Sequence, residues 1–177
     1  MKTKDMTLTA VSAALICVAG PLSVSAGPVP LSLATFAVYF AGAVLGKKRG
    51  VIAAALYLAI GAVGVPVFSG FTGGFQKLAG VTGGYLLGYL PCAFLTGIGA
   101  EKAAAKKSAG WMLPAMMAVG TALLYLIGTI WFMAQTGNNA AGALSLCVLP
   151  FLPGDAVKIA AVTLLSAPVR RTVIREA

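Results

Sequence analysis

The chain has 177 residues, of which 59% are hydrophobic and only 10% are charged, and its formal net charge is +9 with no histidine. Soluble domains carry about a quarter charged residues. This composition therefore predicts an all-α integral membrane protein, with a single transmembrane domain over residues 1–177. The absence of histidine excludes a Ser-His-Asp triad. The three cysteines lie far apart in apolar sequence, so we expect no metal site and no cofactor.

The first apolar run covers residues 6–24 and follows a basic N-terminus. It is long enough to cross about 30 Å of hydrocarbon at about 1.5 Å per residue. The same run also has the pattern of a secretory signal, because small residues from Ser23 to Ala26 resemble a cleavage site. A retained helix gives six spans, whereas cleavage leaves five and does not move the later ones.

Five further apolar segments follow the first. The two prolines of residues 27–30 oppose a helix and favour an extended turn. The basic residues 47–49 are expected to form a tight loop. Trp111 and Trp131 lie near the two ends of the fifth segment, which is typical of anchoring at membrane interfaces. The predicted spans are 6–24, 31–46, 51–68, 81–99, 111–133 and 147–169.

Residues 64–85 form the most unusual stretch, because seven glycines alternate there with aromatic residues such as Phe75. Glycine lets the backbone approach a ligand closely, and aromatic rings offer a packing surface. A non-helical segment this apolar must rest in protein or line a cavity. We therefore expect a loop that covers a ligand, with a flexible loop at the membrane interface as the alternative.

The basic residues predict the orientation of the chain. Eleven of the thirteen Lys and Arg residues fall in the N-terminus, residues 47–49, residues 102–107 and the C-terminus. Six spans place all four segments on one side, which the positive-inside rule assigns to the cytoplasm. We therefore expect a multi-pass protein of a cell membrane, with both termini cytoplasmic and no nucleic-acid partner. The two exceptions, Lys77 and Lys158, belong to the outer half.

Asp155 and Lys158 lie three residues apart at the start of the last apolar run, a spacing that puts both side chains on one helix face. Asp155 is the only carboxylate near membrane-like sequence. Charged groups there are costly and usually mark a substrate path or a partner. With the turn at 27–30 and the glycine-rich loop, they predict an outer pocket for a small ligand with hydrogen-bond donors and acceptors. A structural ion pair that seals a helix end is the alternative.

Small residues mark the first span near its inner end. Ala10 and Ala14 have the spacing that lets another helix approach closely. This pattern is typical either of docking on a partner or of packing within the same chain.

Four motifs together resemble the BioY family, the biotin-specific substrate-binding subunits (S components) of energy-coupling factor (ECF) transporters. The motifs cover nearly the whole chain in order: Pro28-Val-Pro30, Gly64-Val-Pro-Val-Phe68, Thr82-Gly-Gly-Tyr85-Leu86 and Pro150-Phe-Leu-Pro-Gly-Asp155-xx-Lys158. Val81 and Ala34 depart from the family pattern, which often has proline and sometimes glutamine there.

The resemblance implies the ECF S-component fold in a prokaryotic cytoplasmic membrane, with biotin bound near the outer face. Asp155 would accept from the ureido N–H groups of biotin, and Lys158 would donate to one of its acceptors. Tyr85 and Gly84 match the loop of the family, and Thr72 stands where some members have asparagine. Ala10 and Ala14 resemble the face that docks a transmembrane coupling protein, which works with two ATPase subunits. Partners implied are therefore biotin, these three subunits and the lipid bilayer.

Three other hypotheses fit some of the same residues. The chain could be an S component for a different vitamin, although the Asp155 and Lys158 pair argues against that. A small membrane enzyme could use Asp155 as a base and Lys158 as a stabiliser, but the set lacks a nucleophile. A structural membrane protein would leave the glycine-rich loop without a purpose. Binding is therefore preferred to catalysis, and we expect that the chain is not an enzyme.

Overall fold

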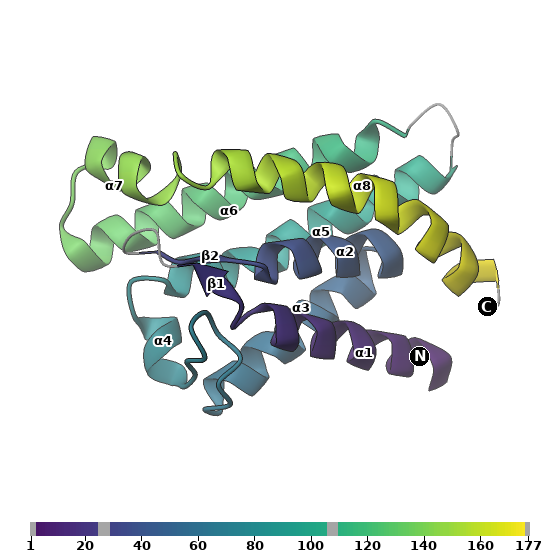
Figure 1. The fold of residues 1–177 in the computed structure, drawn as a ribbon, viewed down its shortest axis with the longest axis horizontal. Coiled ribbons are helices and arrows are strands. Elements are labelled where there is room, and N and C mark those ends of the chain that lie inside the picture. Colours follow the sequence, from purple (N-terminus) through teal and green to yellow (C-terminus); the bar gives the residue numbers. More distant parts are fainter. Residues whose placement is uncertain (1–2, 25–28, 106–109, 176–177) are drawn as a thin grey trace.

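The computed structural model describes residues 3–24, 29–105 and 110–175. Pro28 of the first motif, half of the signal-like site at 23–26, and two of the lysines in the 102–107 connector lie outside the described residues. Within them, the chain forms eight helices and one pair of two-residue strands (Figure 1). The elements are α1 (Thr3–Ala19), β1 (Ser23–Val24), β2 (Leu31–Ser32), α2 (Ala34–Leu45), α3 (Lys47–Ala62), α4 (Phe75–Ala79), α5 (Gly83–Ala105), α6 (Met112–Thr136), α7 (Ala140–Cys147) and α8 (Leu152–Arg175).

Among the described residues, three helices are long and apolar enough to cross a membrane: α5, α6 and the Leu152–Thr172 part of α8. Helix α2 is apolar as well, but it has only 12 residues. The described residues also hold two helices of 16 and 17 residues, α3 and α1. These six helices correspond in order to the six predicted spans, and the count of six spans itself stays a prediction.

Helix α5 lies at the centre of the bundle and packs against α2, α3 and α6. Glycine makes the contact between α5 and α6 close. A Cβ atom on Gly84 would lie 2.3 Å from Cβ of Trp131, and one on Gly128 would lie 2.3 Å from the ring of Tyr85. Both helices therefore need glycine where they meet. The core contains the fully buried side chains of Tyr39, Tyr57, Phe68, Phe132, Ile16 and Met117.

The predicted first span is too long, because α1 ends at Ala19 and Ser23–Val24 forms strand β1. Pro21 explains the stop, since proline lacks the N–H that would continue the helix. Strand β1 pairs antiparallel with β2, so the expected extended turn is part of a short hairpin. The second predicted span also begins too early, because β2 precedes α2 and α2 begins only at Ala34.

The basic residues 47–49 do not form a loop, because they are the first turn of α3. The connection from α2 is Gly46 alone, whose φ of +81° favours glycine. The backbone N–H of Lys47 donates to Oε1 of Glu101 at 3.1 Å, which satisfies a free donor at the start of α3. The carboxylate of Glu101, which is distant in the sequence, therefore caps the start of α3, and α2 and α3 are joined without a loop.

Residues 64–85 are also more helical than predicted, since they include α4 and the start of α5. The last predicted span is divided, because α7 ends at Cys147 and α8 begins at Leu152. Asn139 begins α7 as its N-cap, and its side chain accepts from the N–H of Gly142 at 2.8 Å.

The two ends of the bundle differ in charge. The N-terminus, the α2–α3 junction and the C-terminal ends of α5 and α8 lie at one end, which we call the basic end (Figure 1). Arg49 pairs with Asp5 at 2.6 Å, and Lys47 pairs with Glu101 at 3.3 Å. Nη1 of Arg170 donates to the carbonyl of Ala43 at 3.0 Å. The hairpin, α4 and α7 lie at the opposite end, which we call the cavity end.

Candidate functional site

The first turn of α8 places Asp155 against α6. The side chain is only 4% exposed, and both of its oxygen atoms have partners. Oδ1 accepts from Nζ of Lys158 at 2.9 Å, one turn further along the same helix. Oδ2 accepts from the hydroxyl of Tyr125 on α6 at 2.6 Å. Nζ of Lys158 also donates to the carbonyl of Ser32 on β2 at 2.9 Å.

This cluster is a buried and charge-balanced acceptor site. An ionised carboxylate has about four acceptor positions, so Asp155 can accept further N–H donors besides Tyr125 and Lys158. Taking two charges out of water costs several kcal/mol per ion, which close pairing only partly offsets. A buried pair is therefore weak evidence for stability.

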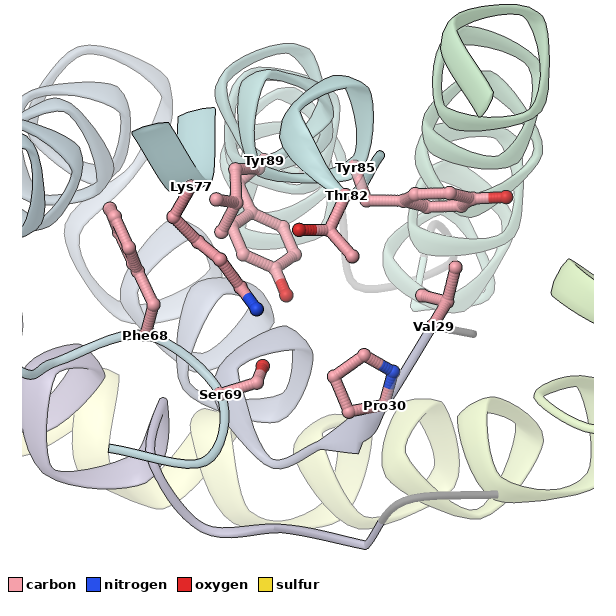
Figure 2. Close-up of a pocket in the computed structure, with 9 residues that line it drawn as sticks. Val29, Pro30, Phe68, Ser69, Lys77, Thr82, Tyr85 and Tyr89 are labelled. Carbon is pink, nitrogen blue, oxygen red and sulfur yellow. The ribbon is translucent and has the colours of Figure 1, made fainter. Parts of the chain in front are cut away.

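A small cavity lies at the same end of the molecule (Figure 2). Its walls come from the residues just before β2, the loop after α3, α4 and the start of α5. In Figure 2 the ammonium group of Lys77 and the hydroxyls of Ser69, Thr82 and Tyr89 point towards one another. The lining residues are Val29, Pro30, Phe68, Ser69, Lys77, Thr82, Tyr85, Leu86 and Tyr89.

Ser32 connects the cavity to the carboxylate cluster. Its carbonyl accepts from Lys158, and its side chain lies beside the hydroxyl of Tyr89. Tyr89 in the cavity wall is thus linked through Ser32 to the cluster of Asp155 and Lys158.

The cavity is small in this structure. Its volume of about 30 Å³ matches one water molecule. Pockets for drug-sized ligands have about 300–1,000 Å³, so a ligand of vitamin size must displace part of the wall. A separate and more open groove of about 530 Å³ lies between the hairpin, the end of α1 and the start of α8, where Lys158 forms part of its wall.

The structure places three of the predicted site residues in or near these groups, and their contact with a ligand stays a prediction. Asp155 and Lys158 are in direct contact, and Tyr85 forms part of the cavity wall. The hydroxyl of Tyr85 points away from the cavity (Figure 2) and lies 3.2 Å from the hydroxyl of Thr129 on α6. Tyr85 therefore offers its ring to the cavity.

The other predicted ligand contacts lie outside the cavity wall. Gly84 packs against Trp131 in the contact of α5 with α6. The hydroxyl of Thr72 donates to the carbonyl of Ser69 at 3.0 Å, which stabilises the turn before α4. Phe75 is 72% exposed. Contacts of these three residues with a ligand stay a prediction of the sequence.

Ala10 and Ala14 lie on an exposed face of α1, whereas their neighbour Ala13 is buried. Packing within the chain thus involves Ala13 and leaves the predicted docking residues free of neighbouring helices. The exposed large side chains on α1 are apolar: Met6, Val11, Leu15 and Val18.

Sequence reasoning missed Tyr125, Tyr89, Lys77 and Ser32. Tyr89 had a usable signal, because it follows Tyr85 by four residues and so shares its helix face. Tyr125 also had one, since a hydroxyl in the middle of an apolar span needs a partner. No group of three or more metal-ligating side chains occurs in the part of the chain that the structure describes.

A bundle of apolar helices that holds a buried, paired carboxylate near a small cavity defines a membrane protein that binds a small polar molecule. The family model described as "BioY family" matches residues 1–175. The chain therefore belongs to the BioY family.

Individual relatives agree with this assignment. The chain is 40% identical over 166 residues to the "Probable biotin transporter BioY" of Pyrococcus horikoshii, covering 94% of this chain and 96% of the relative. It is 38% identical over 158 residues to the "Biotin transporter BioY" of Thermotoga maritima, covering 89% and 90%. These relatives are named as transporters, which confirms the expectation that the chain is not an enzyme.

A solved structure confirms the fold. The crystal structure titled "S-component for biotin from an ECF-type ABC transporter" matches with a TM-score of 0.84 at 27% identity, covering 99% of this chain and 93% of that one. The chain therefore has the helical S-component fold that the sequence motifs predicted.

Proposed function

We propose that this chain is the membrane-embedded, high-affinity biotin-binding subunit of a vitamin uptake transporter. The observation that carries the proposal is the buried carboxylate of Asp155, held by Tyr125 and Lys158 beside the cavity. Biotin has a ureido ring with two N–H donors and a carbonyl acceptor. Asp155 accepts from the N–H groups, and Lys158 donates to an acceptor of the ligand. The names of the relatives support biotin as the ligand.

The chain crosses the cell membrane six times, with both termini in the cytoplasm. Support comes from the basic end, where the chain termini and the α2–α3 junction lie together (Figure 1). The positive-inside rule places such an end in the cytoplasm. The cavity end then faces outward, where biotin is captured.

Uptake requires a transmembrane coupling protein and two ATPase subunits, which supply the energy of ATP hydrolysis. The exposed face of α1 with Ala10 and Ala14 docks the coupling protein, because small residues let a helix approach closely. The apolar side chains beside them would pack against the same partner.

Titration of the purified protein in detergent with biotin tests the proposal by calorimetry. We expect saturable one-to-one binding that riboflavin, thiamine and folate do not compete for. The absence of heat in a protein shown to be folded would contradict biotin as the ligand. Equal binding of another vitamin would favour an S component of different specificity.

A further inference from the structure

Lys77 brings a positive charge to the cavity. It lies on α4, it is half-buried, and its side chain forms part of the cavity wall. Figure 2 shows its ammonium group pointing towards the hydroxyls of Ser69 and Tyr89. A cation surrounded by hydroxyl donors is the arrangement that binds an oxyanion.

No acidic side chain balances this charge among the described residues. The chain has four acidic residues, and three of them pair with other cations: Asp5 with Arg49, Glu101 with Lys47, and Asp155 with Lys158. The fourth, Glu176, lies outside the described residues. The described residues thus hold no unpaired acidic side chain for Lys77, and an anion of another molecule can take this place.

A lysine in the last turn of a helix can instead donate hydrogen bonds to the carbonyl groups there that have no partner within the helix. At the end of α4, two of these carbonyls have partners on α6. The indole N–H of Trp131 donates to the carbonyl of Gly80 at 2.9 Å, and the amide of Gln135 donates to that of Ala79 at 3.2 Å. These bonds fix α4 beside α6, and they leave the ammonium of Lys77 for the cavity.

We propose that Lys77 pairs with the carboxylate of the bound ligand, and that it thereby selects biotin over neutral biotin derivatives. This inference rests on the proposed function. Biotin has its ureido ring and its carboxylate at opposite ends, with an apolar chain between them. Lys77 shares the cavity wall with the rings of Tyr85 and Tyr89, and Tyr89 lies beside Ser32, whose carbonyl accepts from Lys158 of the carboxylate cluster.

The test compares biotin with biotin methyl ester, which has no negative charge. Lys77→Met keeps the length of the side chain and removes its charge, and Lys77→Arg restores the charge. Lys102→Met, at an exposed position of α5 near the basic end, is the matched control. Affinities are measured in detergent by calorimetry, and thermal unfolding reports whether each variant is folded.

We expect the wild-type protein and the Lys102→Met variant to bind biotin about tenfold more tightly than the ester, the size of a charged hydrogen bond. Lys77→Met should bind both ligands with the affinity of the wild-type protein for the ester, and Lys77→Arg should recover the preference. A Lys77→Met variant that keeps the preference would overturn the inference, and so would one that weakens both ligands equally. In both cases the wild-type protein still binds biotin, so the proposed function stands.

A lipid phosphate is the other source of an anion. Wild-type and Lys77→Met proteins are therefore also reconstituted in nanodiscs with and without phosphatidylglycerol. If the variant loses a stabilisation by this lipid while its preference for biotin persists, Lys77 binds the lipid and the inference is wrong. If wild-type protein binds neither biotin nor the ester, the proposed function fails first.

Discussion

The hydroxyl of Tyr125 donates to Oδ2 of Asp155 at 2.6 Å and links α6 to α8 across the interior of the bundle. The carboxylate of Asp155 is buried, and its other oxygen, Oδ1, accepts from Nζ of Lys158 at 2.9 Å. This bond orients the acceptor that we assign to the ureido group. Five predictions follow from this cluster and from the helices around it.

Asp155→Asn should weaken biotin binding more than tenfold, because the amide lacks the negative charge and presents one acceptor oxygen. It also leaves Lys158 without its counter-ion, which costs about 3–5 kcal/mol for a buried pair. Calorimetry measures the affinity. Glu101→Gln breaks a more exposed ion pair at the basic end and should leave the affinity unchanged. Wild-type affinity in folded Asp155→Asn protein would remove Asp155 from the site.

Tyr125→Phe should lower the midpoint of thermal unfolding, because a buried carboxylate oxygen loses its donor at a cost of about 1–3 kcal/mol. The size of the ring is kept, so packing is preserved. The effect of Tyr125→Phe should be much smaller in the Asp155→Asn background, because the stability changes caused by substitutions at contacting residues do not add. Equal shifts in both backgrounds would mean that Tyr125 stabilises the protein independently of Asp155.

Ala14→Trp should spare biotin binding by the purified protein and abolish most ATP-driven uptake by cells that express the whole transporter. The reason is that Ala14 is exposed on α1, where a large ring blocks the close approach of another helix. Val119→Trp on the exposed face of α6 is the control and should retain uptake. Normal uptake by the Ala14→Trp variant would show that the coupling protein docks elsewhere.

Gly84→Ala should destabilise the protein by about 1–3 kcal/mol, as is typical of overpacked cores. The added Cβ would lie 2.3 Å from Cβ of Trp131, so α5 and α6 would have to separate. The measurement is the midpoint of thermal unfolding in detergent. Gly110→Ala meets no atom within 4 Å and should leave the midpoint unchanged. An equally stable Gly84→Ala protein would contradict the close contact of these helices.

Trp131 should report on ligand binding through its fluorescence. Its indole N–H is bonded to the carbonyl of Gly80, directly after α4, and the ligand must displace part of the adjacent cavity wall. Trp111, at the start of the fifth predicted span, is 68% exposed. We expect Trp111→Phe to keep the fluorescence change on addition of biotin and Trp131→Phe to lose it. The opposite result would place the moving segment near Trp111.

Part of the site was predictable from the sequence because its geometry is local. Asp155 and Lys158 belong to one helix, so their spacing alone sets their contact. Tyr85 follows the glycines at the start of α5 and could be placed for the same reason. The partner from α6 could not be placed, because 30 residues separate Tyr125 from Asp155 and the rotation of α6 decides which side chain faces the carboxylate.

The glycine-rich segment shows where composition is insufficient. Its glycines and aromatic residues indicated a cover over a ligand, but backbone conformation decides which rings turn inward. Gly70, Phe71 and Gly74 all have positive φ, and these turns leave Phe71 and Phe75 exposed while Phe68 is buried against the ring of Tyr57. The start of α3 could not be predicted from the neighbouring sequence either, because a single carboxylate from α5 caps α3 directly after Gly46.

The charged contacts at the basic end determine where the bundle can widen. There, the pairs of Asp5 with Arg49 and of Glu101 with Lys47 join α1 to α3 and α5 to α3, and Arg170 joins α8 to α2. At the other end, the hairpin and α4 are attached mainly through single hydrogen bonds to backbone carbonyls. We therefore expect the space that a vitamin needs to come from the cavity end, where loops and the short helix α4 form part of the wall. Ligand capture can then proceed without disturbing the surface that a coupling protein would contact on the inner half of α1.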